Sequence, residues 1–299
     1  MSDYNIKKGN NIHNQYYLLN NNLKIYFNNP KRYLNYLVKK LEKLIKKDLY
    51  IYHNLKDSDG YKYIKDKNNN DAIFLNGAKP YGCNSKFYFL TKSSIDTKNT
   101  KFNNISNESF EYISNKYIKY NENIKFNENG DIIIYLPNLI GFYRKYININ
   151  KLSNLIKFIR EKKNNRIVVR LHHKNHEKKY IKLIKKLVNN FDNIKVDLQK
   201  IEWRDIFDNC CCVFIQNSTM IFILLSYGIP IFNIEMILKL NLFPDLSINL
   251  NVLNDFREEY SKLNRKELLS KYYSSICFAS ESLEDQTDLI LNFYKRNFN

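Results

Sequence analysis

The chain has 299 residues, of which 44% are hydrophobic and 15% aromatic, so it is long and apolar enough for two domains with their own cores. Its five cysteines form no Cys-x-x-Cys pair, which argues against a zinc site, and their odd number favours a reducing compartment. The first eleven residues are polar and lack the apolar core of a signal peptide. A cytoplasmic location is therefore expected.

The formal net charge of +18 raises the question of an anionic partner, such as nucleic acid, a membrane surface or a phosphorylated substrate. Between residues 37 and 47, however, lysines alternate with apolar residues, which is the pattern of a solvated helix face. We therefore expect no nucleic-acid partner, although a basic nucleic-acid-binding protein remains an alternative function. A peripheral contact with a membrane also remains open.

The first 130 residues contain short apolar runs that predict strands, separated by polar segments rich in asparagine. The predicted strands are 23–27, 49–53, 72–75 and 86–90. Pro30 opens an amphipathic helix whose apolar positions continue to Ile45, and a second helix is predicted around residues 109–120.

From residue 131 to residue 233 strands and helices alternate, and the strands are continuous apolar runs. This pattern is typical of a parallel sheet covered on both faces by helices. The predicted strands are 132–136, 166–171, 194–197, 211–215 and 230–233, and the predicted helices are 151–162, 177–189, 203–208 and 220–227. Residues 255–299 are predicted to form two or three helices.

Residues 210–234 carry no charge, and a run of this length also fits a membrane span. The run is broken near its start by Gln216, Asn217, Ser218 and Thr219, and near its end by Gly228-Ile229-Pro230. Those interruptions favour a buried strand, a loop, a helix and a second strand. We therefore expect no transmembrane segment.

Two polar segments occupy positions where α/β proteins bind ligands. The first, Arg170-Leu171-His172-His173-Lys174, follows a predicted strand, and open α/β sheets bind ligands at the carboxyl ends of their strands. Arg170 and Lys174 are cations, and His172 can donate a hydrogen bond to an anionic oxygen, as a leaving phosphate requires. The alternative is a polar cluster that only faces water.

The second segment is the loop of residues 216–219, which lies between a buried strand and an apolar helix. Small hydroxyl residues at a helix N-terminus cap its free N–H groups. The same N–H groups, the hydroxyls and the helix dipole also suit a bound anion, so capping and anion binding both remain open.

Together these segments resemble the C-terminal lobe of the capsule polysaccharide synthesis transferases, a Kdo-transferase-like family with the GT-B fold. The resemblance covers residues 131–235, and its motifs lie at 132–137, 169–173, 203–207, 213–219 and 227–230. It implies two Rossmann-like lobes with parallel sheets that face a cleft. The implied domains are an N-terminal acceptor lobe (1–130), a nucleotide-sugar-binding lobe (131–255) and C-terminal helices that pack across the lobes (256–299).

The resemblance also implies an activity. A glycosyltransferase of this kind would move a sugar from a CMP-, UDP- or GDP-activated donor to a glycan or polysaccharide, with inversion and without a metal or cofactor. The residues implied to hold the donor phosphate and nucleotide are Arg170, His172, Lys174, Gln216, Asn217, Ser218, Thr219 and Glu235.

The sequence departs from the family at two positions. The family's His-Pro is His172-His173 here, and a glutamate that commonly reaches the nucleotide's sugar is replaced by Ile223, so that Glu235 is the candidate to take over a ribose contact. A catalytically degenerate member of the fold therefore remains an alternative, as does a GT-B-type nucleotide-sugar epimerase.

No catalytic base can be identified from the sequence alone. An inverting enzyme needs a carboxylate or histidine near the acceptor hydroxyl. Asp71, Asp96 and His53 in the first lobe are the candidates, each with an ordinary surface or capping role as its alternative.

Overall fold

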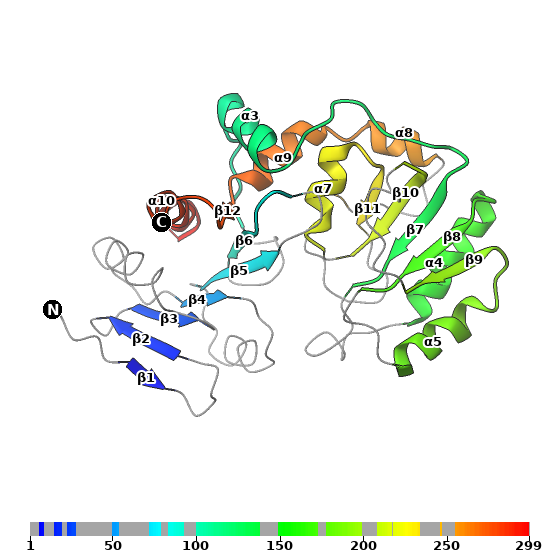
Figure 1. Ribbon diagram of the computed structural model, residues 1–299, viewed down its shortest axis with the longest axis horizontal. Helices are drawn as coiled ribbons and strands as arrows, with labels where there is room; N and C mark the ends of the chain where they lie inside the picture. Colours follow the sequence, from blue (N-terminus) through cyan, green and yellow to red (C-terminus); the bar gives the residue numbers. More distant parts are fainter. Residues whose placement is uncertain are drawn as a thin grey trace. The chain divides into compact units, whose positions relative to one another are not determined.

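The computed structural model shows two compact units, one made of residues 1–79, 85–107 and 270–299 and the other of residues 80–84 and 108–269 (Figure 1). The residues that the structure describes are 6–8, 15–19, 23–27, 50–53, 72–78, 83–92, 100–137, 149–172, 178–198, 208–216, 218–233, 246 and 255–298. The helix predicted from Pro30 onward lies outside these residues, and so does the helix predicted at 203–208 except for Asp208, which is in a turn.

The first unit contains a seven-stranded sheet in the order β1-β2-β3-β4-β5-β6-β12. Its strands are β1 (Ile6–Lys8), β2 (Gln15–Leu19), β3 (Leu23–Phe27), β4 (Tyr50–His53), β5 (Ala72–Ala78), β6 (Phe87–Lys92) and β12 (Ile276–Phe278). The four strands predicted in this region are all present.

The sheet of the first unit is mixed, and the parallel sheet expected for this lobe is wrong. Only β3, β4 and β5 pair in parallel, while the other four pairings are antiparallel. The physical reason is the length of the connections. Residues 20–22 join β2 to β3, and such a short link allows only a hairpin, because a parallel pair needs a long crossover.

The C-terminal residues complete the first unit with a strand that was not predicted. β12 pairs antiparallel with β6 and lies between α9 (Arg265–Tyr273) and α10 (Leu283–Phe298). Phe87 of β6 and Phe278 of β12 are both buried and meet edge to face at 6.0 Å between ring centroids. Residues 276–278 therefore belong to a sheet and not to the helices expected over 255–299.

The second unit contains the predicted parallel sheet, whose order is β11-β10-β7-β8-β9. The strands are β7 (Asp131–Tyr135), β8 (Ile167–Arg170), β9 (Ile194–Asp197), β10 (Cys210–Ile215) and β11 (Ile231–Asn233). The chain runs outward from β7 through β8 to β9, then returns to the other side of β7 with β10 and β11. The direction of winding thus reverses between β7 and β10, the arrangement of a doubly wound sheet.

Helices cover both faces of this sheet. They are α4 (Ile149–Lys162), α5 (Lys178–Val188), α7 (Met220–Tyr227) and α8 (Phe256–Ser261). Helix α3 (Asn107–Lys116) lies apart from this sheet and contacts α9 through the ion pair of Glu111 with Lys266 (Figure 1). Right-handed crossovers place α4 and α5 on one face and α7 on the other (Figure 1). The apolar stripe of α4 is buried as predicted, at Leu152, Leu155, Ile156 and Ile159.

The long uncharged run forms the centre of this unit. All six residues of β10 are buried, and so are the residues of α7 from Met220 to Ser226. Within the described part of the chain no helix combines the length and the hydrophobicity that crossing a bilayer requires.

Candidate functional site

One row of residues ends the five parallel strands of the second unit. In register across the sheet these are Asn233, Ile215, Tyr135, Arg170 and Asp197. The fold therefore brings two predicted segments to the same end of the sheet, since Arg170 ends β8, His172 follows two residues later and the 216–219 loop follows β10. The reversal of winding lies between Tyr135 and Ile215, where doubly wound sheets leave a crevice for a ligand.

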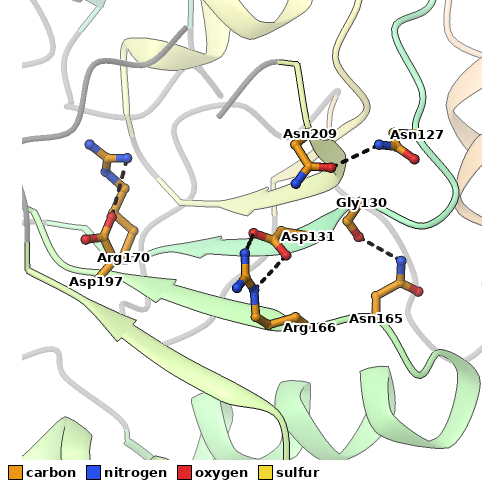
Figure 2. Close-up of polar contacts among 8 residues, drawn as sticks. All are labelled: Asn127, Gly130, Asp131, Asn165, Arg166, Arg170, Asp197 and Asn209. Carbon is orange, nitrogen blue, oxygen red and sulfur yellow. Dashed lines mark hydrogen bonds and ion pairs between the residues drawn. The ribbon is translucent and has the colours of Figure 1, made fainter. Parts of the chain in front are cut away.

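Arg170 forms an ion pair with a residue that the sequence analysis did not single out. Its Nη1 lies 3.6 Å from Oδ2 of Asp197, and the two side chains are only 6% and 5% exposed (Figure 2). Burial lowers the pKa of the Arg170 guanidinium, and the negative charge of Asp197 opposes that shift. The signal that could have found Asp197 is its position at the last residue of the neighbouring strand.

Tyr135 is a second residue that the sequence analysis missed. It ends β7 beside Arg170, and its ring centroid lies 6.3 Å from that of His172. Burial raises the pKa of its hydroxyl from 10.0 to about 12, and the positive charge of Arg170 opposes the rise. Tyr135, Arg170, His172 and Asp197 together make a polar cluster, which we call the strand-end cluster.

The raised pKa of Tyr135 predicts a loss of stability in alkali. A folded-state pKa above the unfolded one means that ionisation opposes folding, so stability is intact below about pH 10 and is lost progressively up to about pH 12. The loss from this residue is about 2–3 kcal/mol. Tyr135→Phe is expected to reduce the loss in urea titrations at rising pH, but not to abolish it, because burial also raises the pKa of Tyr260.

The control for this measurement is Tyr112→Phe, since Tyr112 is 49% exposed. This variant is expected to keep the pH dependence of the parent protein. An alkaline profile that Tyr135→Phe leaves unchanged would contradict the effect of burial on Tyr135.

The residues of the loop after β10 differ in their hydrogen bonds and in their exposure. The Oγ of Ser218 accepts a hydrogen bond from the backbone N–H of Met220 at 3.3 Å, and its carbonyl accepts one from the N–H of Ile221 at 3.1 Å. Ser218 therefore caps the first turn of α7. Gln216 is buried, whereas Ser218 and Thr219 are partly exposed.

Thr219 differs from Ser218 in its hydrogen bonds. Its side chain makes no capping hydrogen bond, and among the described residues neither its hydroxyl nor its N–H has a partner. Thr219 can therefore donate to a ligand from both groups without breaking a hydrogen bond that the structure describes.

Ile223 is completely buried inside α7. The side chain at this position therefore faces the core of the second unit. Of the other predicted site residues, Lys174, Asn217, Glu235, Asp71 and Asp96 lie outside the described residues, as does His173. His53 is the last residue of β4 in the first unit.

At the opposite end of the parallel sheet, where the strands begin, the polar residues form hydrogen bonds with one another. Arg166 donates from Nε and Nη2 to the two carboxylate oxygens of Asp131 at 2.9 and 2.7 Å (Figure 2). Asn165 donates to the carbonyl oxygen of Gly130 at 2.7 Å, and Asn127 donates to Asn209 at 3.0 Å. These groups bond to one another, so this end has a structural role.

The five cysteines are free and buried. Burial raises the pKa of the Cys210 thiol, so it stays protonated and serves as a small apolar residue at the start of β10. Among the described residues no group of three histidine, cysteine or acidic side chains could hold a metal ion.

No family model and no curated protein matches the sequence. Several solved structures are similar to the chain at low identity. TarM is 13% identical with a TM-score of 0.36 over 94% of this chain, which spans 64% of the TarM chain. A variant of the wall teichoic acid polymerase TagF is 13% identical with a TM-score of 0.32, over 63% of this chain and 48% of TagF.

A third similar structure is S. aureus MnaA in a co-structure with UDP. It is 10% identical with a TM-score of 0.33, over 81% of this chain and 72% of the MnaA chain. Similarities of this extent leave the activity of the chain to be inferred from its own residues.

Proposed function

We propose that the chain is a glycosyltransferase that binds a nucleotide-sugar donor at the C-terminal edge of the parallel sheet in its second unit. The observation that carries this proposal is the strand order. It places the Gln216–Thr219 loop at the end of β10, next to β7, where the winding of the sheet reverses. Doubly wound sheets bind nucleotides at this point.

The charges at this edge suit a diphosphate or monophosphate ester. The N-terminus of α7 carries the positive end of the helix dipole, and the hydroxyl and N–H of Thr219 face no competing partner among the described residues. Arg170 adds a buried positive charge to this end of the sheet, where it forms an ion pair with Asp197. His172 and Lys174 would complete the anion site.

The part of this proposal that concerns sugar transfer rests on the sequence resemblance. We expect an inverting, metal-independent transfer from a CMP-, UDP- or GDP-sugar to a glycan. The first 130 residues would bind the acceptor and supply the base, with Asp71, Asp96 and His53 as candidates. Glu235, in place of a residue on the buried α7, would contact the ribose.

A nucleotide panel tests the donor site directly. CMP, UDP, GDP and their sugar conjugates are added to the protein, and the melting temperature is measured. A ligand at about one hundred times its dissociation constant stabilises the folded state by about 2.7 kcal/mol, which is readily detected. If none of these nucleotides raises the melting temperature, the donor site is not at this edge.

A single substitution locates the bound phosphate. Thr219→Val removes a hydroxyl that makes no hydrogen bond among the described residues, so the melting temperature without ligand is expected to stay within a degree or so. The nucleotide-induced shift is expected to fall, because loss of a hydrogen bond to a charged oxygen weakens binding by about tenfold. Isothermal titration of the panel nucleotide measures the change.

The matched control is Ser153→Ala, which removes a hydroxyl from α4 on the other face of the sheet. It should bind the nucleotide as the parent does. The protein is then incubated with the nucleotide-sugar and a glycan acceptor, and chromatography measures the free nucleotide that is released. A transferase releases nucleotide, whereas a protein that only binds the donor does not. An unchanged affinity of Thr219→Val would remove this residue from the site.

A further inference from the structure

Helix α5 presents an unusual concentration of positive charge. Five of its eleven residues are lysines, and all five are exposed: Lys178, Lys179, Lys182, Lys185 and Lys186. Among the described helices it is the one that carries basic residues and no acidic residue, because α3, α4, α8, α9 and α10 each contain at least one carboxylate. The helix itself thus carries five positive charges and no negative one.

The helix is held rigidly beneath this charged surface. Its opposite face carries Tyr180, Ile184 and Val188, which are buried, and α5 packs on the sheet beside the edge strand β9 (Figure 1). The spacing of four residues between these three side chains keeps them on one side of the helix. The backbone of the lysines is therefore held on the sheet, and their side chains are exposed to solvent.

An apolar side chain lies among the lysines. Leu183 is 41% exposed, and Leu183 and Tyr112 are the two large apolar residues exposed in the described part of the chain. Leu183 is one helical turn from Lys179 and from Lys186, so it shares their surface. We call Leu183 and these neighbouring lysines, Lys179, Lys182 and Lys186, the α5 face.

We propose that the α5 face docks on the surface of a membrane that contains anionic lipids. The lysines would contact the lipid phosphates, and Leu183 would enter the boundary between headgroups and acyl chains. The combination of lysines with an exposed leucine favours a membrane over a nucleic acid as the partner. A nucleic acid offers phosphates but no hydrocarbon for Leu183, and this face has no exposed aromatic side chain on which a base could stack. The proposal does not depend on the proposed function.

Vesicle sedimentation tests the proposal with the full chain. We expect the protein to sediment with vesicles that contain phosphatidylglycerol, to stay in solution with phosphatidylcholine alone, and to be released by high salt. The variant Lys179→Gln, Lys182→Gln, Lys186→Gln is expected to bind on the order of one hundredfold more weakly. Leu183→Ser is expected to lose about tenfold, because its side chain no longer enters the bilayer.

The matched control changes three lysines elsewhere, Lys101→Gln, Lys119→Gln and Lys295→Gln, all exposed and outside α5. It removes the same net charge and should bind vesicles nearly as well as the parent. Equal losses in the two triple variants would mean that net charge and not the α5 face drives binding. Failure of the parent protein to bind anionic vesicles would also overturn the proposal.

Two further measurements complete the test. Single-stranded RNA that binds more tightly than the vesicles, with an affinity that Leu183→Ser leaves unchanged, would replace the membrane by a nucleic acid. The nucleotide-induced rise in melting temperature is measured on the same variants and is expected to be unchanged. A failed membrane test therefore leaves the proposed function standing, and the reverse also holds.

Discussion

Asp197→Ala is expected to lower the free energy of unfolding by about 3–5 kcal/mol, because it takes the carboxylate partner from a buried guanidinium. Both side chains of the Arg170–Asp197 pair are almost fully buried, so water cannot solvate the guanidinium that the substitution leaves without its carboxylate. Urea denaturation of the parent and the variant at neutral pH measures the difference. The same change at the partly exposed pair of Arg166 and Asp131, Asp131→Ala, is expected to cost about 1 kcal/mol or less.

A double variant separates the structural role of this pair from its role in binding. Arg170→Leu combined with Asp197→Leu is expected to recover most of the lost stability, because an apolar pair can replace a buried ion pair at little cost. The nucleotide-induced rise in melting temperature is expected to be lost in this double variant, since the guanidinium is gone. If Asp197→Ala costs no more than Asp131→Ala, the pair does not stabilise the strand-end cluster.

Gly228→Ala is expected to destabilise the protein by about 3 kcal/mol or more, for two reasons that add. Gly228 has a φ of 77°, in the left-handed region, where a side chain costs about 1–2 kcal/mol. A Cβ at this position would also lie 2.1 Å from the backbone carbonyl oxygen of Asn123, which cannot turn aside like a side chain. Overpacking of this kind costs about 1–3 kcal/mol.

Two other substitutions to alanine set the scale for Gly228. Gly130→Ala also places a Cβ close to backbone, 2.8 Å from the carbonyl oxygen of Asn209, but no strain from a positive φ adds to it. Asn154→Ala, at an exposed position of α4, is expected to be neutral or slightly stabilising, because alanine is the better helix former. The expected order of cost is Gly228, then Gly130, then Asn154. Thermal and urea unfolding of the three variants check this order, and a Gly228→Ala variant as stable as Asn154→Ala would contradict it.

The strands and helices of the second unit could be predicted because their signal is local. Ile132 to Leu136 is a continuous apolar run, and Leu152, Leu155, Ile156 and Ile159 recur at helical spacing, so burial of these side chains follows from the pattern alone. Four strands of the first unit could be predicted for the same reason. β12 could not, because its three residues are short and its partner, β6, lies far away in the sequence.

The position of two polar segments could be predicted, and their role in binding a ligand stays a prediction. The segments around Arg170 and Ser218 were recognised because polar residues directly after an apolar strand are unusual, and the two segments lie at one edge of the sheet. Their detailed roles could not be read from the sequence. Asp197 has no local feature that marks it as the partner of Arg170, and Ser218 and Thr219 differ only in which hydroxyl the helix uses.

The sequence by itself determined that residues 131–233 form a parallel α/β sheet, since a buried strand needs apolar side chains on both of its faces. It also determined that the uncharged run around the Gln216–Thr219 loop folds inside a domain. Only the tertiary structure decided that β10 returns beside β7, that Asp197 meets Arg170 and that Ile223 faces the core. The physical reason is that strand pairing and charge pairing join residues far apart in the chain, and a local pattern carries no record of the partner.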